Sequence, residues 1–294
     1  MSELVLKNES LPGLYQSADA ASLEAQTVYF IALKAYLFLL VVAAFVSFAW
    51  PKNYYGAIVS AVLFLLTLGI LIYLRVYRPD DIWYNGRAVA ESVKTRAWRW
   101  VMRAEPYEDT DSIEIVSKQF INDLKTILHQ NRSLSKVLDP SVGSEAPISE
   151  VMASIRRLSV EERLSIYQVQ RIVNQATWYS KKSLFNKRRS KQWFGVSVAL
   201  HLLAFIMLLY RIKDPLMSLP VESIAVAAGA VLTWLQAKKH NELNSSYSLA
   251  AHEIVLIKGE SLDVKSEKEL SAFVLDSESA FSREHTQWTA RKVE

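Results

Sequence analysis

Hydrophobic residues are concentrated in four blocks, and a long polar stretch separates the second block from the third. The blocks cover about residues 28–50, 54–74, 193–210 and 219–237. A helix of roughly 20 apolar residues crosses the ~30 Å hydrocarbon core of a bilayer. The pattern therefore predicts an all-α integral membrane protein with four transmembrane helices in two hairpins, closed by the short loops after the first and third blocks.

The fourth block is the least apolar, because alanine dominates it and Glu222 interrupts its beginning. Ala225 and Gly229 are four residues apart, a spacing of small residues that lets helix backbones approach closely in a membrane. Gly56 and Ser60 repeat this spacing in the second block. We therefore expect the fourth block to span the membrane and take Gly229 as a candidate helix-packing position.

Outside the blocks the apolar spacing is mostly helical. The pattern S-x-x-E at residues 159–162 and 266–269 predicts two capping boxes. No strong helix breaker lies between Val160 and Tyr210, so one helix is expected to continue from a polar region into the third block. The fourth block is expected to continue in the same way until Gly259, which would follow the end of the helix.

Two polar segments carry apolar stripes at helical spacing, and these stripes need partners. They predict a cytoplasmic helical bundle, with a linker marked by Pro140, Gly143 and Pro147. Because the order helix, hairpin, helix occurs twice, we divide the chain into a first two-span domain (1–105), a helical connector (106–158) and a second two-span domain (159–294). The stripes are Ile113, Val116, Phe120, Leu124 and Ile127, and Leu270, Phe273, Ser277, Phe281 and Trp288.

Lysine and arginine set the expected orientation. They are dense after the second block and before the third, whereas the two short loops carry only Lys52, and Arg211 with Lys213. Loops rich in Lys and Arg stay in the cytoplasm. Both short loops should therefore lie outside, with both termini and the middle segment in the cytoplasm. The net charge of +4, from 34 Lys and Arg against 30 Asp and Glu, does not alter this assignment.

A basic cluster precedes the third block. The first interpretation is contact with anionic lipid, which also fixes the topology. Binding of an anionic nucleotide and binding of RNA are the alternatives, but the cluster lacks the interleaved aromatic residues on which bases stack. The cluster consists of Lys181, Lys182, Lys187, Arg188, Arg189 and Lys191.

Two ionisable residues, His201 and Glu222, fall within or beside apolar blocks. Such residues are candidates for function in a membrane. His201 could line a pore or hydrogen-bond a neighbouring helix. Glu222 could be an intramembrane group, or it could lie at the outer interface beside Pro220.

The sequence gives no sign of catalytic, cofactor or metal chemistry. Its eight glycines form no GxxxxGK, GxGxxG or GxSxG motif, and it has no cysteine. His252 and Glu253 begin an H-E-x-x-H pattern, but Leu256 occupies the position of the second histidine. We therefore expect neither an enzyme nor a cofactor.

A helix from Arg87 onward carries Arg87, Glu91, Lys94 and Trp98 on one stripe. One interpretation is a solvated helix in which Glu91 pairs with Lys94. The other is a contact between subunits or between repeats, with Trp98, Trp100 and the arginines Arg96, Arg99 and Arg103 at the level of the lipid headgroups.

The segment from Trp83 to Pro106 resembles the signature that follows the hairpin in one branch of the SLATT proteins. The second half is similar to another SLATT branch, with Trp178 and Tyr179 before its hairpin and a set of signature residues in its last helix. We take the signature residues as helix-packing or coupling positions. They include Arg87, Glu91, Lys94 and Trp98 in the first half and Glu278, Phe281, Glu284, His285 and Trp288 in the second.

SLATT proteins are bacterial two-span domains found beside synthases and sensors of nucleotide messengers. The resemblance implies an inner-membrane effector of a conflict or antiphage system, which forms pores and causes dormancy or death when triggered. Its implied partners are the lipid bilayer and a nucleotide-signal synthase or sensor, with no nucleic acid. Four spans leave little room for an aqueous path, so we also expect a homo-oligomer. The alternatives are a regulated ion channel without a death role and a non-conducting scaffold that docks a cytosolic sensor.

Overall fold

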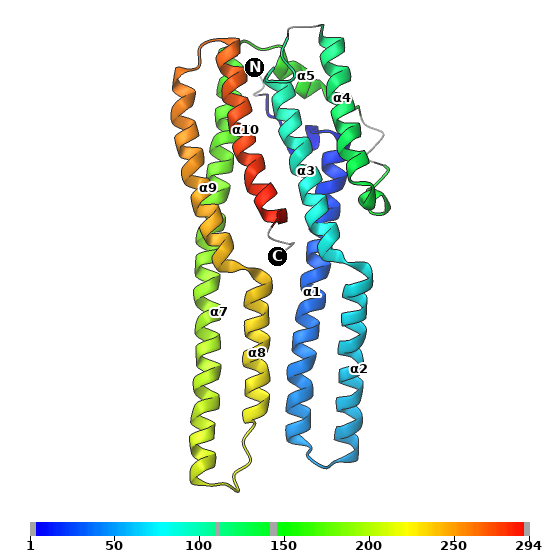
Figure 1. Cartoon of the computed structure of the whole chain (residues 1–294), viewed down its shortest axis with the longest axis vertical. Helices are drawn as coiled ribbons and strands as arrows, with labels where there is room; N and C mark the ends of the chain where they lie inside the picture. The colour runs from blue at the N-terminus through cyan, green and yellow to red at the C-terminus, as the bar shows by residue number, and fades with distance from the viewer. Residues whose placement is uncertain (1–3, 110–111, 142–145, 291–294) are drawn as a thin grey trace. The chain divides into compact units, whose positions relative to one another are not determined.

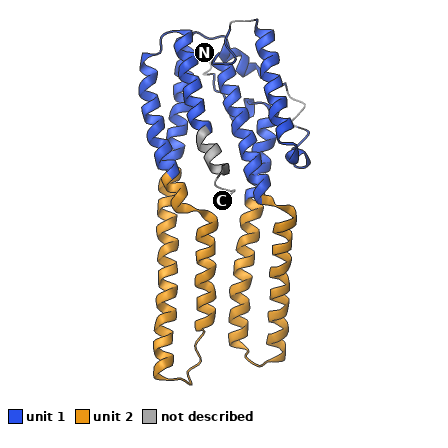
Figure 2. Cartoon of the chain, in the orientation of Figure 1, with its two compact units in different colours: residues 1–26, 80–181, 246–294 blue, residues 27–79, 182–245 orange. Residues whose placement is uncertain are grey.

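The computed structural model describes residues 4–109, 112–141 and 146–290, with the backbone alone for residues 283–290. Over these ranges the chain is helical and has no strand (Figure 1). It forms two compact units (Figure 2). Unit 1 consists of Met1–Gln26, Asp80–Lys181 and Ser246–Glu294, and unit 2 of Thr27–Pro79 and Lys182–Ser245. Each unit therefore draws on both halves of the sequence.

The first hairpin of unit 2 joins α1 (Gly13–Ala49) to α2 (Tyr54–Tyr77). The Asn53 side chain accepts a hydrogen bond of 2.8 Å from the backbone N–H of Tyr55, which caps α2. A Cβ added to Gly56 would lie 2.7 Å from the Cβ of Trp50. Gly56 therefore allows the tight turn of this hairpin, and it is not an open helix-packing face.

The second hairpin joins α7 (Asn174–Lys213) to α8 (Val221–Lys238). The hydroxyl of Ser223 in α8 donates a hydrogen bond of 2.9 Å to the Ala44 carbonyl in α1. The rings of Phe30 and Trp234 make a T-shaped contact with centroids 5.8 Å apart. α8 therefore packs against α1 within unit 2 through Ser223 and Trp234, and not through the face of Ala225 and Gly229, which is exposed.

The expected continuation of the fourth block to Gly259 is wrong. Lys239 adopts a left-handed conformation (φ 49°), which ends α8, and a new helix, α9 (His240–Glu260), begins at the next residue. Gly259 lies inside α9, before its last residue. The chain changes direction at a lysine, which sequence patterns do not mark as a stop signal.

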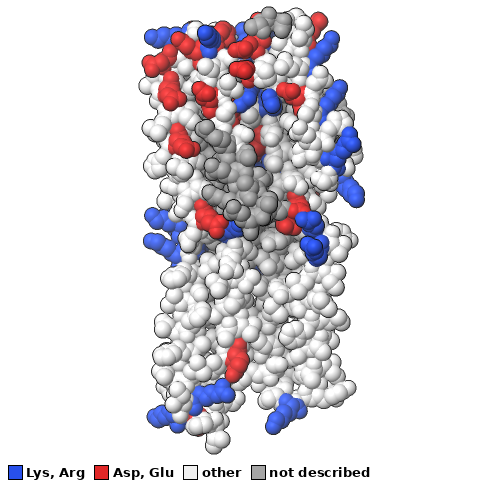
Figure 3. Space-filling model, in the orientation of Figure 1, with Lys and Arg blue, Asp and Glu red and all other residues white. Residues whose placement is uncertain are grey.

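Three helical segments are long and apolar enough to cross a membrane: Gly13–Ala49, Tyr54–Val101 and Val160–Lys213. In the most apolar stretch of the second and third segments, only 6% and 0% of the residues are buried. The face of unit 2 in Figure 3 is almost free of charge along its helices. Apolar surface on this scale needs a lipid or protein partner.

Unit 1 contains α3 (Pro79–Val101), α4 (Ile113–Gln130), α5 (Glu150–Arg156), α6 (Val160–Tyr167) and α10 (Glu267–Ala290). A π-helical turn, Gln168–Val173, connects α6 to α7 without a break, so the expected unbroken helix through Tyr210 is confirmed. Both predicted capping boxes are also confirmed, at Ser159 with Glu162 and at Ser266 with Glu269.

Both apolar stripes contribute to the core of unit 1. The buried members are Val116, Phe120 and Leu124 in α4, and Leu270, Phe273, Ser277 and Phe281 in α10. Ile113 is exposed, and Ile127 packs at the edge of the core. The side chain of Trp288 and residue Gly143 of the predicted linker lie outside the described part of the chain.

Trp98 and Trp100 are buried in this core, so their expected location at the lipid headgroups is wrong. Trp98 makes an edge contact with Tyr167, and Trp100 packs near Phe120. Their apolar rings complete the core at the end of α3, where the sequence pattern alone suggested an interface with lipid.

Two buried arginines cap the end of α3. Arg156 donates to the carbonyls of Trp100 and Tyr107, and Arg163 donates to the Met102 carbonyl at 2.7 Å. The last carbonyls of a helix lack partners within it and carry partial negative charge. The arginines therefore fix α3 against α5 and α6.

Candidate functional site

The strongest concentration of buried charge lies in unit 1, around Glu278 of α10. The Arg171 side chain is 2% exposed and that of Glu278 is 0% exposed. Arg171 Nε and Nη2 donate to the two carboxylate oxygens of Glu278 at 2.8 and 2.7 Å. The Tyr167 hydroxyl and Thr95 Oγ1 donate to the same carboxylate at 2.9 and 3.0 Å. Four hydrogen bonds thus satisfy a carboxylate that is removed from water.

The π-helical turn places Arg171 at this carboxylate. Tyr167 ends α6 and Arg171 lies within the turn, so the two side chains reach Glu278 from successive turns of one segment. The Arg171 guanidinium also lies 5.0 Å from the centroid of Phe281, while its Nη1 has no hydrogen-bond partner among the described residues. Short π-helical turns within α-helices often mark functional sites.

The predicted α3 stripe adjoins this carboxylate. Arg87 forms an ion pair with Glu91 at 2.7 Å and with Asp19 of α1 at 3.3 Å. Lys94 Nζ lies 5.7 Å from the centroid of Tyr15, also in α1. The stripe therefore faces the first turns of α1, which belong to unit 1, and it is not a solvated face. We call Asp19, Arg87, Glu91, Lys94, Arg171 and Glu278 the ionic cluster.

Burial and neighbouring charges shift the pKa values of this cluster. Burial, followed by the positive charge of Arg171, lowers the pKa of Lys94. Burial and the negative charge of Glu278 raise the pKa of the Tyr167 hydroxyl well above its ordinary value, so Tyr167 remains a hydrogen-bond donor. Burial lowers the pKa of Arg171, but the negative charge and hydrogen bonds of Glu278, together with Glu91 and Tyr167, outweigh burial and raise that pKa. The cluster holds three acidic and three basic groups in close balance.

The other predicted residues lie apart from this cluster. His201 is exposed, and its Nδ1 lies 2.7 Å from the Ser197 carbonyl of its own helix. Glu222 is exposed and pairs with Arg211 at 3.0 Å, close to the loop of the second hairpin. Gly229 is exposed, and a Cβ added there would meet nothing within 4 Å. The side chains of Glu284 and Trp288, near the end of α10, lie outside the described residues.

The six residues of the basic cluster are all exposed on α7. The buried face of the same helix is polar, with Ser183, Asn186 and Ser190 bonded to Asn244, His240 and Asn241. The six cationic side chains therefore lie on the exposed side of α7, opposite this polar face.

Sequence reasoning missed the pair Arg171 and Glu278 as a site. The two residues are 107 positions apart, and no local spacing signals their contact. In the sequence, only the SLATT resemblance points to Glu278. Tyr167 and Arg171, four residues apart, gave the one available local signal, because such residues share a helix face.

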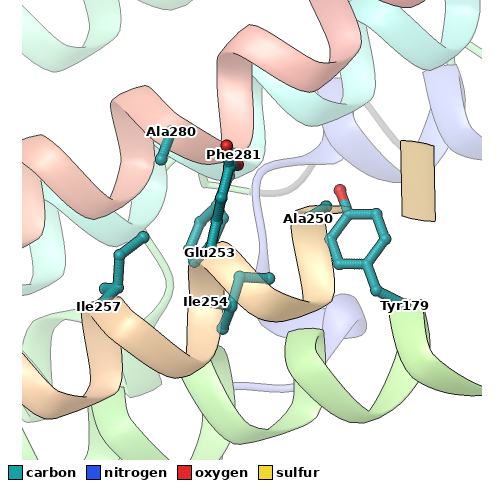
Figure 4. A pocket seen from close by; sticks show the side chains of 7 residues that line it. All are labelled: Tyr179, Ala250, Glu253, Ile254, Ile257, Ala280 and Phe281. Carbon is teal, nitrogen blue, oxygen red and sulfur yellow. The ribbon is translucent and has the colours of Figure 1, made fainter. Parts of the chain in front are cut away.

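A small hollow between α7, α9 and α10 has an empty volume of about 210 Å³, including space open to solvent (Figure 4). Apart from Glu253 and the Tyr179 hydroxyl, the described residues that line it are apolar, among them Ile254, Ile257 and Phe281. Ligand pockets usually measure about 300–1,000 Å³. Over the described ranges, no three His, Asp or Glu side chains are grouped closely enough to hold a metal ion.

Two family models match the chain in tandem. The model described as SMODS and SLOG-associating 2TM effector domain 3 matches residues 12–164. The model described as SMODS and SLOG-associating 2TM effector domain 1 matches residues 167–288. Each match contains one of the hairpins. No curated protein and no solved structure matches the chain.

Proposed function

Because the chain belongs to the SLATT family of two-transmembrane effector domains, with one such domain in each half, we propose that it is a pore-forming effector of a bacterial conflict system. The observation that carries this proposal is the exposed apolar surface of the hairpins in unit 2. Such a surface suits a bilayer. Opening of the pore would cause dormancy or death of an infected cell.

We propose four spans in the bacterial inner membrane, with α8 as the fourth. Its 18 residues correspond to about 27 Å of helix, close to the thickness of the hydrocarbon core. Its contacts with α1 support this assignment, because a helix rich in small residues gains from packing against a neighbour. The distribution of Lys and Arg favours both hairpin loops outside and unit 1 in the cytoplasm.

We also propose that the pore is built from several copies of the chain. Ala225 and Gly229 of α8 are exposed, and nothing within 4 Å would meet a Cβ at Gly229. This open face would allow close contact with a helix of another copy. A single chain with four spans offers little space for a water-filled path.

The trigger is proposed to act on unit 1, through a nucleotide-signal synthase or sensor, or through the nucleotide itself. A partner shifts a closed-to-open balance only by binding the two states with different affinity. Rearrangement of a buried ionic cluster would change the free energy of the bundle strongly, because a buried charge that loses its partner is destabilising. α7 supplies residues to both units, so it offers a direct path from unit 1 to unit 2.

Ion flux through liposomes that contain the purified full chain, combined with toxicity after induction in bacteria, tests the proposal. Flux together with toxicity supports the effector. Flux without toxicity would indicate a regulated channel, and toxicity without flux would exclude a pore. The absence of both, in cells that also produce a nucleotide-signal synthase or sensor, would favour the scaffold.

A further inference from the structure

Three hydrogen-bond donors in unit 2 lie at one indole ring, and none of them has an acceptor among the described residues: the N–H of Trp234 and the ammonium groups of Lys34, which is exposed, and Lys238. Lys34 Nζ of α1 lies 5.4 Å from the ring centroid of Trp234 in α8, and Lys238 Nζ lies 5.1 Å from it. Lys238 Nζ is also 3.2 Å from the centroid of Phe30. Trp234 is only 8% exposed, and its indole N–H has no hydrogen-bond partner in the described part of the chain. A buried donor without a partner requires an explanation.

The charge around these donors is positive and uncompensated. Among the described residues, neither Lys34 nor Lys238 forms an ion pair with a carboxylate. The positive charge also affects the nearby His240: burial, followed by the charges of Lys238 and Arg189, lowers its pKa. Two lysines that lie over the same indole ring repel each other unless an anion lies between them. The missing component is therefore an anion that can also accept a hydrogen bond from an indole.

The surroundings select a lipid over a soluble anion. Ile31 and Phe38 lie three residues before and four residues after Lys34, so all three share one face of α1, and both apolar side chains are exposed. Lysines and tryptophans at the ends of spanning helices lie at the level of the headgroups. An amphiphile can place its phosphate at the lysines and its acyl chains along the face that carries Ile31 and Phe38.

We propose that Lys34, Lys238 and the indole N–H of Trp234 form a binding site for the phosphate of an anionic phospholipid headgroup. The two ammonium groups neutralise the phosphate, and the indole donates a hydrogen bond to one of its oxygens. A bound lipid would hold α1 and α8 together at one end of the two hairpins. The site goes beyond the proposed effector function, and it exists whether or not the chain conducts ions.

Native mass spectrometry of the purified full chain in neutral detergent, titrated with phosphatidylglycerol, tests the site. The double variant Lys34→Gln, Lys238→Gln should weaken phosphatidylglycerol binding about tenfold or more, because it removes both cations. Trp234→Phe keeps an aromatic ring at this position but loses the N–H, and it should weaken binding a few-fold. Lys118→Gln with Lys125→Gln removes the same charge from the exposed surface of α4 in unit 1 and should change binding less than twofold.

Two further arms identify the ligand. Phosphatidylcholine, which has the phosphate but no net charge, should bind more weakly than phosphatidylglycerol, and millimolar inorganic phosphate should not displace the bound lipid. The site is refuted if Lys34→Gln, Lys238→Gln binds phosphatidylglycerol like the parent or no more weakly than the Lys118, Lys125 control. Displacement of the lipid by inorganic phosphate would overturn the lipid assignment. Unchanged helicity and unfolding temperature of each variant ensure that a loss of binding reflects the site.

Discussion

At the scale of single residues, Glu278 shows how unit 1 keeps a charge in its interior. A fully buried carboxylate is stable only when hydrogen-bond donors of the protein replace the lost water. Arg171, Tyr167 and Thr95 supply these donors. Such a pair adds little net stability compared with apolar residues of similar size. Its presence is better explained by a requirement for one specific arrangement of α3, α10 and the π-helical turn.

Glu278→Gln should lower the free energy of unfolding of unit 1 by about 3–5 kcal/mol, since it leaves Arg171 charged, buried and unpaired. Chemical denaturation of the purified chain in detergent, followed by circular dichroism, measures this. The double variant Arg171→Met, Glu278→Leu removes both charges and should recover most of the loss. Equal destabilisation by the single and double variants would show that the pairing is not the source of the effect.

Lys94→Met should stabilise the protein at neutral pH. Burial and Arg171 lower the pKa of Lys94 in the folded state, so the unfolded state binds the proton more strongly and protonation opposes folding. This penalty is complete below the folded pKa and vanishes as the pH rises past the unfolded value of about 10.4. The difference in unfolding temperature between Lys94→Met and the parent should therefore shrink between pH 7 and pH 10. A constant difference would assign the gain to packing.

At the scale of elements, the sequence predicted those features that neighbouring residues determine. The capping boxes, the hairpin loops and the helix through Tyr210 depend on residues close together in the chain. The end of α8 at Lys239 does not, because a lysine in the left-handed conformation is held there by its surroundings. The burial of Trp98 and Trp100 likewise depends on α4 and α6. These helices are distant in the sequence, so the spacing of residues within α3 does not reveal the contact.

Gly86 controls the approach of α1 to α3. A Cβ at this position would lie 3.0 Å from the Ala18 carbonyl oxygen and 3.1 Å from the Ser22 Cβ. Gly86→Ala should therefore cost about 1–3 kcal/mol of overpacking, offset in part by up to ~1 kcal/mol of helix propensity. Gly259→Ala, in open space within α9, is the matched control and should be neutral or stabilising. Thermal unfolding of both variants measures the change in stability. A higher unfolding temperature for Gly86→Ala would mean that α1 can move to accommodate the methyl group without loss of stability.

At the scale of the whole molecule, the family and the membrane helices could be read from the sequence, whereas the ionic cluster could not. Its α3 half was visible as the stripe of Arg87, Glu91 and Lys94. Its other half was not, because Arg171 and Glu278 come from segments that only the tertiary fold brings together. Local spacing identifies one helix face, and only the packed structure identifies the residues opposite it.

Gly229→Leu should reduce the oligomeric mass of the purified chain, because the larger side chain occupies the open face of α8. Gly195→Leu is a matched control: Gly195 is also exposed in unit 2, on α7, with nothing within 4 Å of an added Cβ. Size-exclusion chromatography with light scattering gives the mass in detergent. An unchanged mass for Gly229→Leu, or an equal decrease for Gly195→Leu, would rule out this face as the specific contact.

Coupling of unit 1 to the pore can be tested with two substitutions in one chain. Tyr167→Phe removes one donor to Glu278 in unit 1 and should change the flux through liposomes if the ionic cluster biases the open state. Leu184 is an exposed residue of α7 in unit 2, so Leu184→Pro breaks the helix with little loss of packing. Combined with Leu184→Pro, the effect of Tyr167→Phe should disappear, whereas with Leu184→Ala it should persist. A double-mutant cycle isolates this interaction, because independent sites give additive changes. If Tyr167→Phe alters the flux equally in all three backgrounds, the signal does not travel along α7.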